Sequence, residues 1–181
     1  MKITGTGDRE ILNFHVPGDM PDLQSLHLDV LDFGVCAITP CAIGFIQHDA
    51  IHRLCERHPR ITSAFWRQTL IDASVYREWI INSRREAYSA MAHLLCEMIV
   101  RLQAVGLAGA FSCHLPMTQS EFADALGIPT VHTNRVLQEL RAAGLITLKG
   151  QTLSVLDWEG LTTAGDFDPT YLHLKQGSGP T

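Results

Sequence analysis

Six consecutive residues in the C-terminal half carry side chains that could bind another molecule specifically. They open a predicted helix within residues 127–146, and nearly all can form hydrogen bonds: Thr130, Val131, His132, Thr133, Asn134 and Arg135. The guanidinium fork of Arg135 can pair with O6 and N7 of guanine, and the methyl groups of Val131 can contact a thymine methyl. Threonine hydroxyls can instead bind phosphate. The pattern predicts a helix that docks on another polymer through its first two turns, and the chemistry favours DNA.

The residues around this helix predict a helix-turn-helix. Thr118 and Glu121 have the spacing of a capping box, which starts a first helix. Gly127 allows the positive φ of a tight turn, Pro129 suits the first turn of the next helix, and Gly144 ends it. The apolar residues of both helices are expected to face inward: Phe122, Ala123, Leu126, Val136, Leu137 and Leu140.

A β-hairpin is predicted directly after the second helix. Apolar residues alternate through "LITLKGQTLSV" on either side of Lys149 and Gly150, which have the character of a two-residue turn. A hairpin in this place is the wing of a winged-helix domain. Lys149 at the wing tip and Gln119 at the start of the first helix are well placed for phosphate contacts.

Residues 59–105 predict two consecutive helices. The segment has no glycine before Gly106 and no proline after Pro59, and a capping box of Ser83 and Glu86 predicts a break between helices over 59–82 and 84–105. The second helix has core residues at helical spacing: Met91, Leu94, Leu95, Met98, Ile99 and Leu102.

The helix over 59–82 has apolar residues on two sides. One side carries Ile61, Phe65, Val75 and Trp79, and the other carries Trp66, Leu70, Ala73 and Ile80. Two stripes indicate burial against two objects, since a surface helix needs only one. The N-terminal part of the chain can cover the first stripe, and a second copy of the same helix can cover the second stripe in a two-fold dimer. The alternative is a helix central to a monomeric core.

Residues 1–58 predict strands and turns. "EILNFHVPGD" predicts a short strand closed by a Pro-Gly-Asp turn, and "VCAITPCAIGFI" predicts two short strands interrupted at Pro40.

Composition limits the function classes. The 181 residues are 46% hydrophobic and 18% charged, which is typical of a folded protein, and no apolar run is long enough for a membrane span. The N-terminus lacks the apolar core of a secretory signal, and five cysteines without CxxC spacing suit a reducing cytoplasm. A net charge of −5 argues against a non-specific nucleic-acid binder.

Three other interpretations stay open. The winged helix could contact proteins instead of DNA, and Arg135 could simply pair with Glu139 on the surface. A metal or thiol sensor would use the cluster of His48, His52, Cys55 and His58. We expect no enzyme, because no nucleophile–base pair or phosphate-binding glycine loop is evident, and we expect no metal or other cofactor.

Residues 11–155 resemble the Crp/Fnr family of bacterial transcription regulators. The resemblance is carried by "FHVPGD", "RREAYSAMAHLLCEMIVRLQAVGL", "LPMTQSEFADALGI", "VHTNRVLQELRAAGLI" and the wing. It implies an α+β fold with a partial, cupin-like β-roll effector domain over 1–58, a dimerisation helix over 59–82 and a winged helix-turn-helix over 83–181. It also implies a homodimer on two-fold symmetric double-stranded DNA, a cytoplasmic location, and RNA polymerase as a further candidate partner.

The chain departs from the family pattern in three respects. Family members usually have about fifty more residues of β-roll, so we expect this chain to begin partway through the sensor domain. The positions that bind cyclic AMP in some members fall on Leu23, Phe33 and Gly34, and an apolar phenylalanine cannot neutralise a phosphate. We therefore expect no cyclic AMP binding. The cysteine cluster of the iron–sulfur members is also missing from the sequence.

Overall fold

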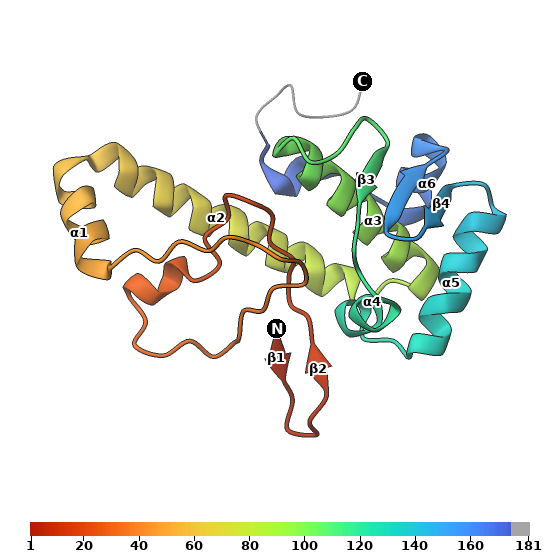
Figure 1. The fold of residues 1–181 in the computed structure, drawn as a ribbon, viewed down its shortest axis with the longest axis horizontal. Coiled ribbons are helices and arrows are strands. Elements are labelled where there is room, and N and C mark those ends of the chain that lie inside the picture. Colours follow the sequence, from red (N-terminus) through yellow and green to blue (C-terminus); the bar gives the residue numbers. More distant parts are fainter. Residues whose placement is uncertain (175–181) are drawn as a thin grey trace.

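The computed structural model describes residues 1–174, and its helices and strands divide into an N-terminal segment, a long helix and a C-terminal domain. In chain order the elements are β1 (Lys2–Ile3), β2 (Arg9–Glu10), the 3-10 turn η1 (Leu23–Leu26), α1 (His48–Arg57), α2 (Pro59–Asn82), α3 (Ala87–Ala104), β3 (Ser112–His114), α4 (Gln119–Leu126), α5 (Thr130–Ala142), β4 (Ile146–Lys149), β5 (Thr152–Val155), α6 (Trp158–Gly165) and the 3-10 turn η2 (Pro169–Leu172). Figure 1 shows α2 leading from α1 at one end of the molecule to the C-terminal domain at the other.

The long helix α2 has the predicted bounds of 59–82. Pro59 occupies its first turn, where the missing N–H costs no hydrogen bond. The predicted break before α3 is present, but the capping box of Ser83 and Glu86 is wrong. Ser83 keeps a helical backbone and its hydroxyl donates to the Ile80 carbonyl, so it ends α2 instead of starting α3. Glu86 adopts the extended backbone of an N-cap without a side-chain cap.

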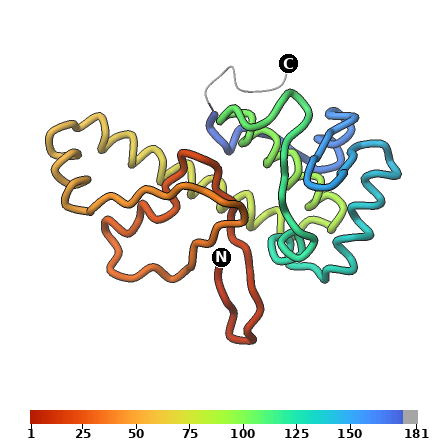
Figure 2. Tube along the Cα trace, in the orientation of Figure 1, coloured from red at the N-terminus to blue at the C-terminus, as the bar shows by residue number. Residues whose placement is uncertain are grey.

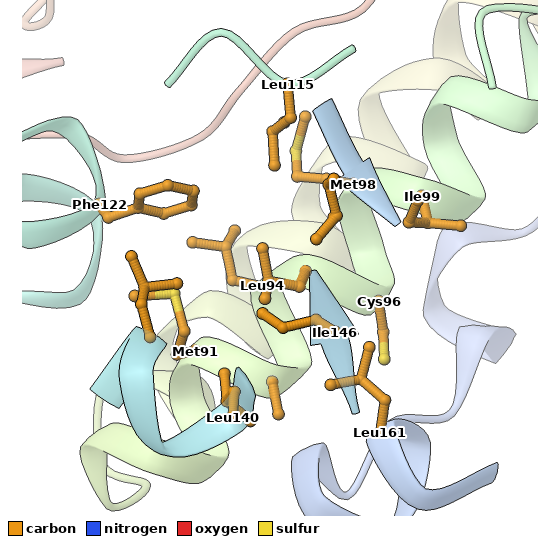
Figure 3. Close-up of a cluster of buried hydrophobic side chains, with 14 of the residues drawn as sticks. Met91, Leu94, Cys96, Met98, Ile99, Leu115, Phe122, Leu140, Ile146 and Leu161 are labelled. Carbon is orange, nitrogen blue, oxygen red and sulfur yellow. The ribbon is translucent and has the colours of Figure 1, made fainter. Parts of the chain in front are cut away.

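The core of the C-terminal domain is built around α3, which is buried on every side. All six predicted core residues of this helix are buried. Figure 3 shows four of them, Met91, Leu94, Met98 and Ile99, among side chains from α4, α5, β4 and α6. The antiparallel sheet has the order β3-β5-β4. At the crossing of α6 and α3, a Cβ on Gly165 would lie 2.6 Å from the backbone nitrogen of His93, so only glycine allows this approach.

The N-terminal segment has little regular structure (Figure 2). Only β1 and β2 pair, in an antiparallel ribbon with Ile3 opposite Arg9. The Pro-Gly-Asp turn is confirmed, since Gly18 has a φ of +97° and the carboxylate of Asp19 accepts from the N–H of Val16. The two strands expected within residues 35–46 are wrong. A strand needs a neighbour for its backbone groups, and no neighbouring strand in residues 1–174 lies against this apolar stretch.

A buried carboxylate joins α2, α3 and η2. Glu97 on α3 is 1% exposed, and it accepts hydrogen bonds from Trp79 Nε1 on α2 at 3.1 Å and from the Tyr171 hydroxyl at 2.7 Å. Arg101, one turn later, donates to Glu97 at 3.0 Å and reaches Asp19 in the N-terminal segment at 3.1 Å. These bonds hold α2 and the N-terminal segment against the C-terminal domain.

The mixed α+β class and the C-terminal winged helix are thus confirmed. The domain boundaries at 58 and 82 stay a prediction, and the core runs across them, because Phe14 belongs to the same buried cluster as α3 and packs on Trp79 with ring centroids 5.8 Å apart.

Candidate nucleic-acid interface

The first helix of the motif, α4, begins with the predicted capping box. The Thr118 hydroxyl accepts from the backbone N–H of Glu121 at 3.2 Å, and the Glu121 carboxylate accepts from the N–H of Thr118 at 2.6 Å. The inward face of α4 is buried as predicted: Phe122, Ala123 and Leu126. Helix α4 therefore has a fixed start and a fixed inward face.

The turn between α4 and α5 orients the second helix. Gly127 ends α4 in the left-handed conformation with a φ of +63°, which an L side chain rarely adopts. Pro129 is the N-cap of α5, and its carbonyl accepts from the N–H groups of His132 and Thr133. Helix α5 leaves the turn at an angle to α4 (Figure 1).

One side of α5 is buried and the other faces solvent. The buried side consists of Thr133, Val136, Leu137 and Leu140. Among the six residues predicted to contact DNA, Thr130, Val131 and Arg135 are exposed, while His132 and Asn134 are half-buried. Val131 is 86% exposed, which is unusual for a large apolar side chain in a folded domain.

The expectation that Thr133 faces another molecule is wrong. Its side chain is fully buried, and its hydroxyl donates to the Pro129 carbonyl at 3.3 Å. The hydroxyl satisfies its hydrogen-bonding capacity within the helix, so the residue can occupy an inward position.

Gln138 belongs to the exposed side of α5 and was missed at the sequence level. It is exposed one turn beyond Asn134 and Arg135, at helical spacing from both. That spacing could have placed Gln138 on the same side of the helix as Asn134 and Arg135. Its amide can hydrogen-bond to the edge of adenine.

Arg135 forms an ion pair with Glu139, one helical turn later. Arg135 Nε lies 3.1 Å from Glu139 Oε1, and the two side chains are 72% and 47% exposed. The pairing considered from the sequence is therefore present. It engages Nε, so the two terminal nitrogens of the guanidinium still lack an acceptor among residues 1–174.

The wing is confirmed, with a different turn. Lys149 pairs with Thr152 as the last pair of the β4–β5 hairpin, so the turn residues are Gly150 and Gln151 instead of Lys149 and Gly150. Gly150 has a φ of +58°. Lys149 is exposed at the end of β4, and Gln119 is exposed at the start of α4.

Charge is sparse on this domain, and most of its acidic groups have partners. Residues 106–160 contain Arg135, Arg141 and Lys149 against Glu121, Asp124, Glu139, Asp157 and Glu159. Glu121 and Asp157 cap helices, and Asp124 pairs with Arg9 of β2. Arg141 and Lys149 form no ion pair within residues 1–174, so both remain available to phosphate.

Helix α2 presents an apolar stripe that is exposed to solvent among residues 1–174. Trp66, Leu70 and Ile80 are 67%, 53% and 62% exposed, and Ala73 between them is half-buried. The opposite stripe is covered, because Val75 is buried and Trp79 packs on Phe14. This arrangement is what a helix needs if a second copy is to cover its free side.

The histidine and cysteine cluster is spread along α1 and the residue after it. His48 Nε2 lies 3.1 Å from the Ser25 hydroxyl, and the rings of His52 and His27 lie 6.0 Å apart. Within residues 1–174, no three His, Cys, Asp or Glu side chains are grouped closely enough to hold a metal ion. In the same part of the chain, no helix combines the length and the apolar character needed to cross a membrane.

Comparison with known sequences places the helix-turn-helix in a known group. Residues 89–164, from α3 into α6, match the family described as a Crp-like helix-turn-helix domain. The transcriptional activator protein Anr of Pseudomonas aeruginosa is 23% identical over 158 residues, covering 86% of this chain and 64% of that protein. The transcriptional activator protein FnrL of Cereibacter sphaeroides is 26% identical over 152 residues, covering 80% and 59%. This chain spans less than two thirds of the length of these two relatives.

A solved structure shares the fold. FixK2 from Bradyrhizobium japonicum aligns with a TM-score of 0.59 at 20% identity, covering 66% of this chain and 59% of that one.

Proposed function

We propose that this chain is a DNA-binding transcription regulator of the Crp/Fnr type that acts as a homodimer on a two-fold symmetric site. The observation that carries the proposal is the solvent-facing side of α5, which is mostly polar, is not packed against another element within residues 1–174, and is presented by a helix-turn-helix with a wing. A bacterial regulator of this kind works in the cytoplasm, where the chromosome is, and RNA polymerase is a further proposed partner.

The N-terminal part of α5 is proposed to enter the major groove, as the second helix of this motif does in general. Arg135 would pair with guanine, Asn134 with an adenine edge, and Val131 with a thymine methyl. Thr130 would bind a base edge or phosphate, and His132 would reach the groove from the side of the helix. Thr133 has no part in this contact because it is buried.

Lys149 and Gln119 are proposed to bind the sugar-phosphate backbone on either side of α5. Both are exposed, and they lie on the wing and at the N-terminus of α4. Contacts of this kind fix the register of a protein on the duplex without reading its sequence.

The exposed stripe of α2 is proposed as the dimer interface. Trp66, Leu70, Ala73 and Ile80 follow one another by four, three and seven residues, which is the spacing of a helix that packs against a second helix. Two copies related by two-fold symmetry would place two α5 helices on half-sites about one turn of DNA apart.

A salt series separates this proposal from a winged helix that contacts proteins. The probe is a pool of random-sequence duplexes of about 40 base pairs, and binding is measured by fluorescence anisotropy at several salt concentrations. We expect weak binding whose affinity falls linearly on a log–log plot, because each neutralised phosphate releases counterions. Binding that does not change with salt would contradict the proposal and favour protein contacts.

We also propose that cyclic AMP is not the effector. The positions expected to bind it hold Leu23, which is 6% exposed, with Phe33 and Gly34, and none of these offers a charge to a phosphate. Titration calorimetry with cyclic AMP should give no heat of binding. A micromolar dissociation constant would refute the proposal.

A further inference from the structure

Arg135 forms an ion pair with Glu139, although both side chains lie largely in solvent. Their contact of 3.1 Å joins Nε, and not the end of the guanidinium, to the carboxylate. We propose that Glu139 is a positioning residue, which holds Arg135 in the orientation that reads one guanine per half-site. This inference rests on the proposed function.

The ion pair with Glu139 leaves the terminal N–H groups of Arg135 free to bind a base. A guanidinium has five N–H donors, and Glu139 uses only the one on Nε. The two terminal nitrogens keep four donors in a planar fork, and such a fork matches the two acceptors on the major-groove edge of guanine. The ion pair and the base contact can therefore form at the same time.

The position of Glu139 suits this role. Side chains of a helix lean toward its N-terminus, so Glu139 leans back over the turn that carries Arg135. Val131, Asn134 and Gln138 lie around the same exposed side of α5. A free arginine would lose many rotamers on binding, and an arginine already held by Glu139 loses fewer.

The same carboxylate also opposes binding to every duplex. It places a negative charge on the side of α5 proposed to face the polyanionic DNA, which disfavours cognate and unrelated DNA alike. Glu139 should therefore raise base discrimination while lowering overall affinity. An ordinary surface ion pair would not produce these two opposite effects.

Two substitutions at position 139 separate the effects. Glu139→Ala removes both the acceptor and the charge, whereas Glu139→Gln keeps an oxygen that can accept from Arg135 Nε. Each is measured on the site selected by wild type, on the same site with each base pair changed in turn, and on a scrambled duplex. Glu159→Gln on α6 is the charge control, since it removes an exposed carboxylate of the same domain that has no ion pair within residues 1–174.

We expect Glu139→Ala to lower discrimination at the base pair read by Arg135 by about two- to fivefold per half-site, which is the range of an exposed pair. Glu139→Gln should retain most of that discrimination. Both variants should bind the scrambled duplex more tightly than wild type, and Glu159→Gln should leave discrimination unchanged. In an Arg135→Ala background, Glu139→Ala should have no further effect on discrimination.

The inference is overturned if Glu139→Ala keeps full discrimination while Arg135→Ala loses it, because Arg135 would then read DNA without help. A uniform gain in affinity without loss of discrimination would also overturn it, since Glu139 would then act through charge alone. If Arg135→Ala itself changes nothing, both this inference and the proposed role of α5 fail. Thermal unfolding by circular dichroism confirms that each variant is folded.

Discussion

The buried side of α5 follows the helical spacing of its residues, even at a position occupied by a polar side chain. The inward positions of Val136, Leu137 and Leu140 follow from the helical period, and all three are buried. Thr133 has the same spacing, three residues before Val136, but its polarity suggested an outward contact. The structure resolves the conflict in favour of spacing, because the hydroxyl bonds to a carbonyl one turn earlier.

Replacing Thr133 with valine tests this assignment. Valine has the same shape without the hydroxyl, so the variant should lose only the bond to the Pro129 carbonyl. We expect the free energy of unfolding to fall by about 0.5–1.5 kcal/mol and the preferred DNA site to stay the same. Urea unfolding and a binding selection measure the two effects. A change in the selected site without a change in stability would show that Thr133 contacts DNA.

At the scale of elements, local patterns predict helices well and long-range contacts poorly. The bounds of α2, the capping box of α4 and the wing all follow from residues close in sequence. The buried position of Glu97 does not, because its partners Trp79 and Tyr171 come from distant parts of the chain. The residues next to Glu97 in the sequence do not indicate that Trp79 and Tyr171 will donate hydrogen bonds to it. The prediction of two strands within residues 35–46 failed for the same reason. A strand forms only if another strand pairs with it, and the local sequence does not specify that partner.

The packing of α3 against α6 and η2 predicts a dependence of stability on pH. His93 on α3 lies 3.1 Å from the Gly165 carbonyl and 3.2 Å from the Tyr171 hydroxyl, and is 1% exposed. Burial lowers the pKa of His93 below its ordinary value, although the bond to Gly165 acts in the opposite direction. Below about pH 6.5 the unfolded chain therefore takes up a proton that the folded chain resists. The stability contributed by neutral His93 is present above that pH and is lost as the pH falls toward the folded pKa.

We expect the free energy of unfolding to fall by up to about 1.4 kcal/mol per pH unit in this window because of His93. His93→Gln should lower stability at pH 7.5 but reduce the loss between pH 7.5 and 5.5. The measurement is urea unfolding at both pH values and at one protein concentration, with His52→Gln on the exposed side of α1 as the control. Equal losses in wild type and in His93→Gln would contradict this assignment.

At the scale of the whole molecule, the apolar stripe of α2 stays exposed to solvent among residues 1–174. Large apolar side chains such as Trp66 and Leu70 are rarely this exposed side by side on a monomer without a partner. The double substitution Leu70→Glu and Ala73→Glu should therefore give monomers, because it places like charges opposite each other in the dimer. Analytical ultracentrifugation measures this directly. Ala64→Glu is the matched control, since Ala64 is exposed on α2 outside the stripe.

A monomeric wild type at micromolar concentration would contradict the dimer proposal. Dissociation of the Ala64→Glu control would show that any charge on α2 disrupts the assembly, and the stripe would then have no special role.

The claim that α5 reads DNA is tested most directly by a binding selection on randomised duplexes with wild type, Arg135→Ala and Lys149→Ala. Wild type should select a two-fold symmetric site. Arg135→Ala should relax one base-pair position in each half-site, at a cost of about 1–3 kcal/mol of discrimination. Lys149→Ala should weaken all sequences alike and lower the salt slope by about one per subunit. Both side chains are exposed, so both variants should stay folded. If Arg135→Ala leaves the preferred site and its affinity unchanged, α5 does not read DNA, and a winged helix that contacts proteins becomes the better account.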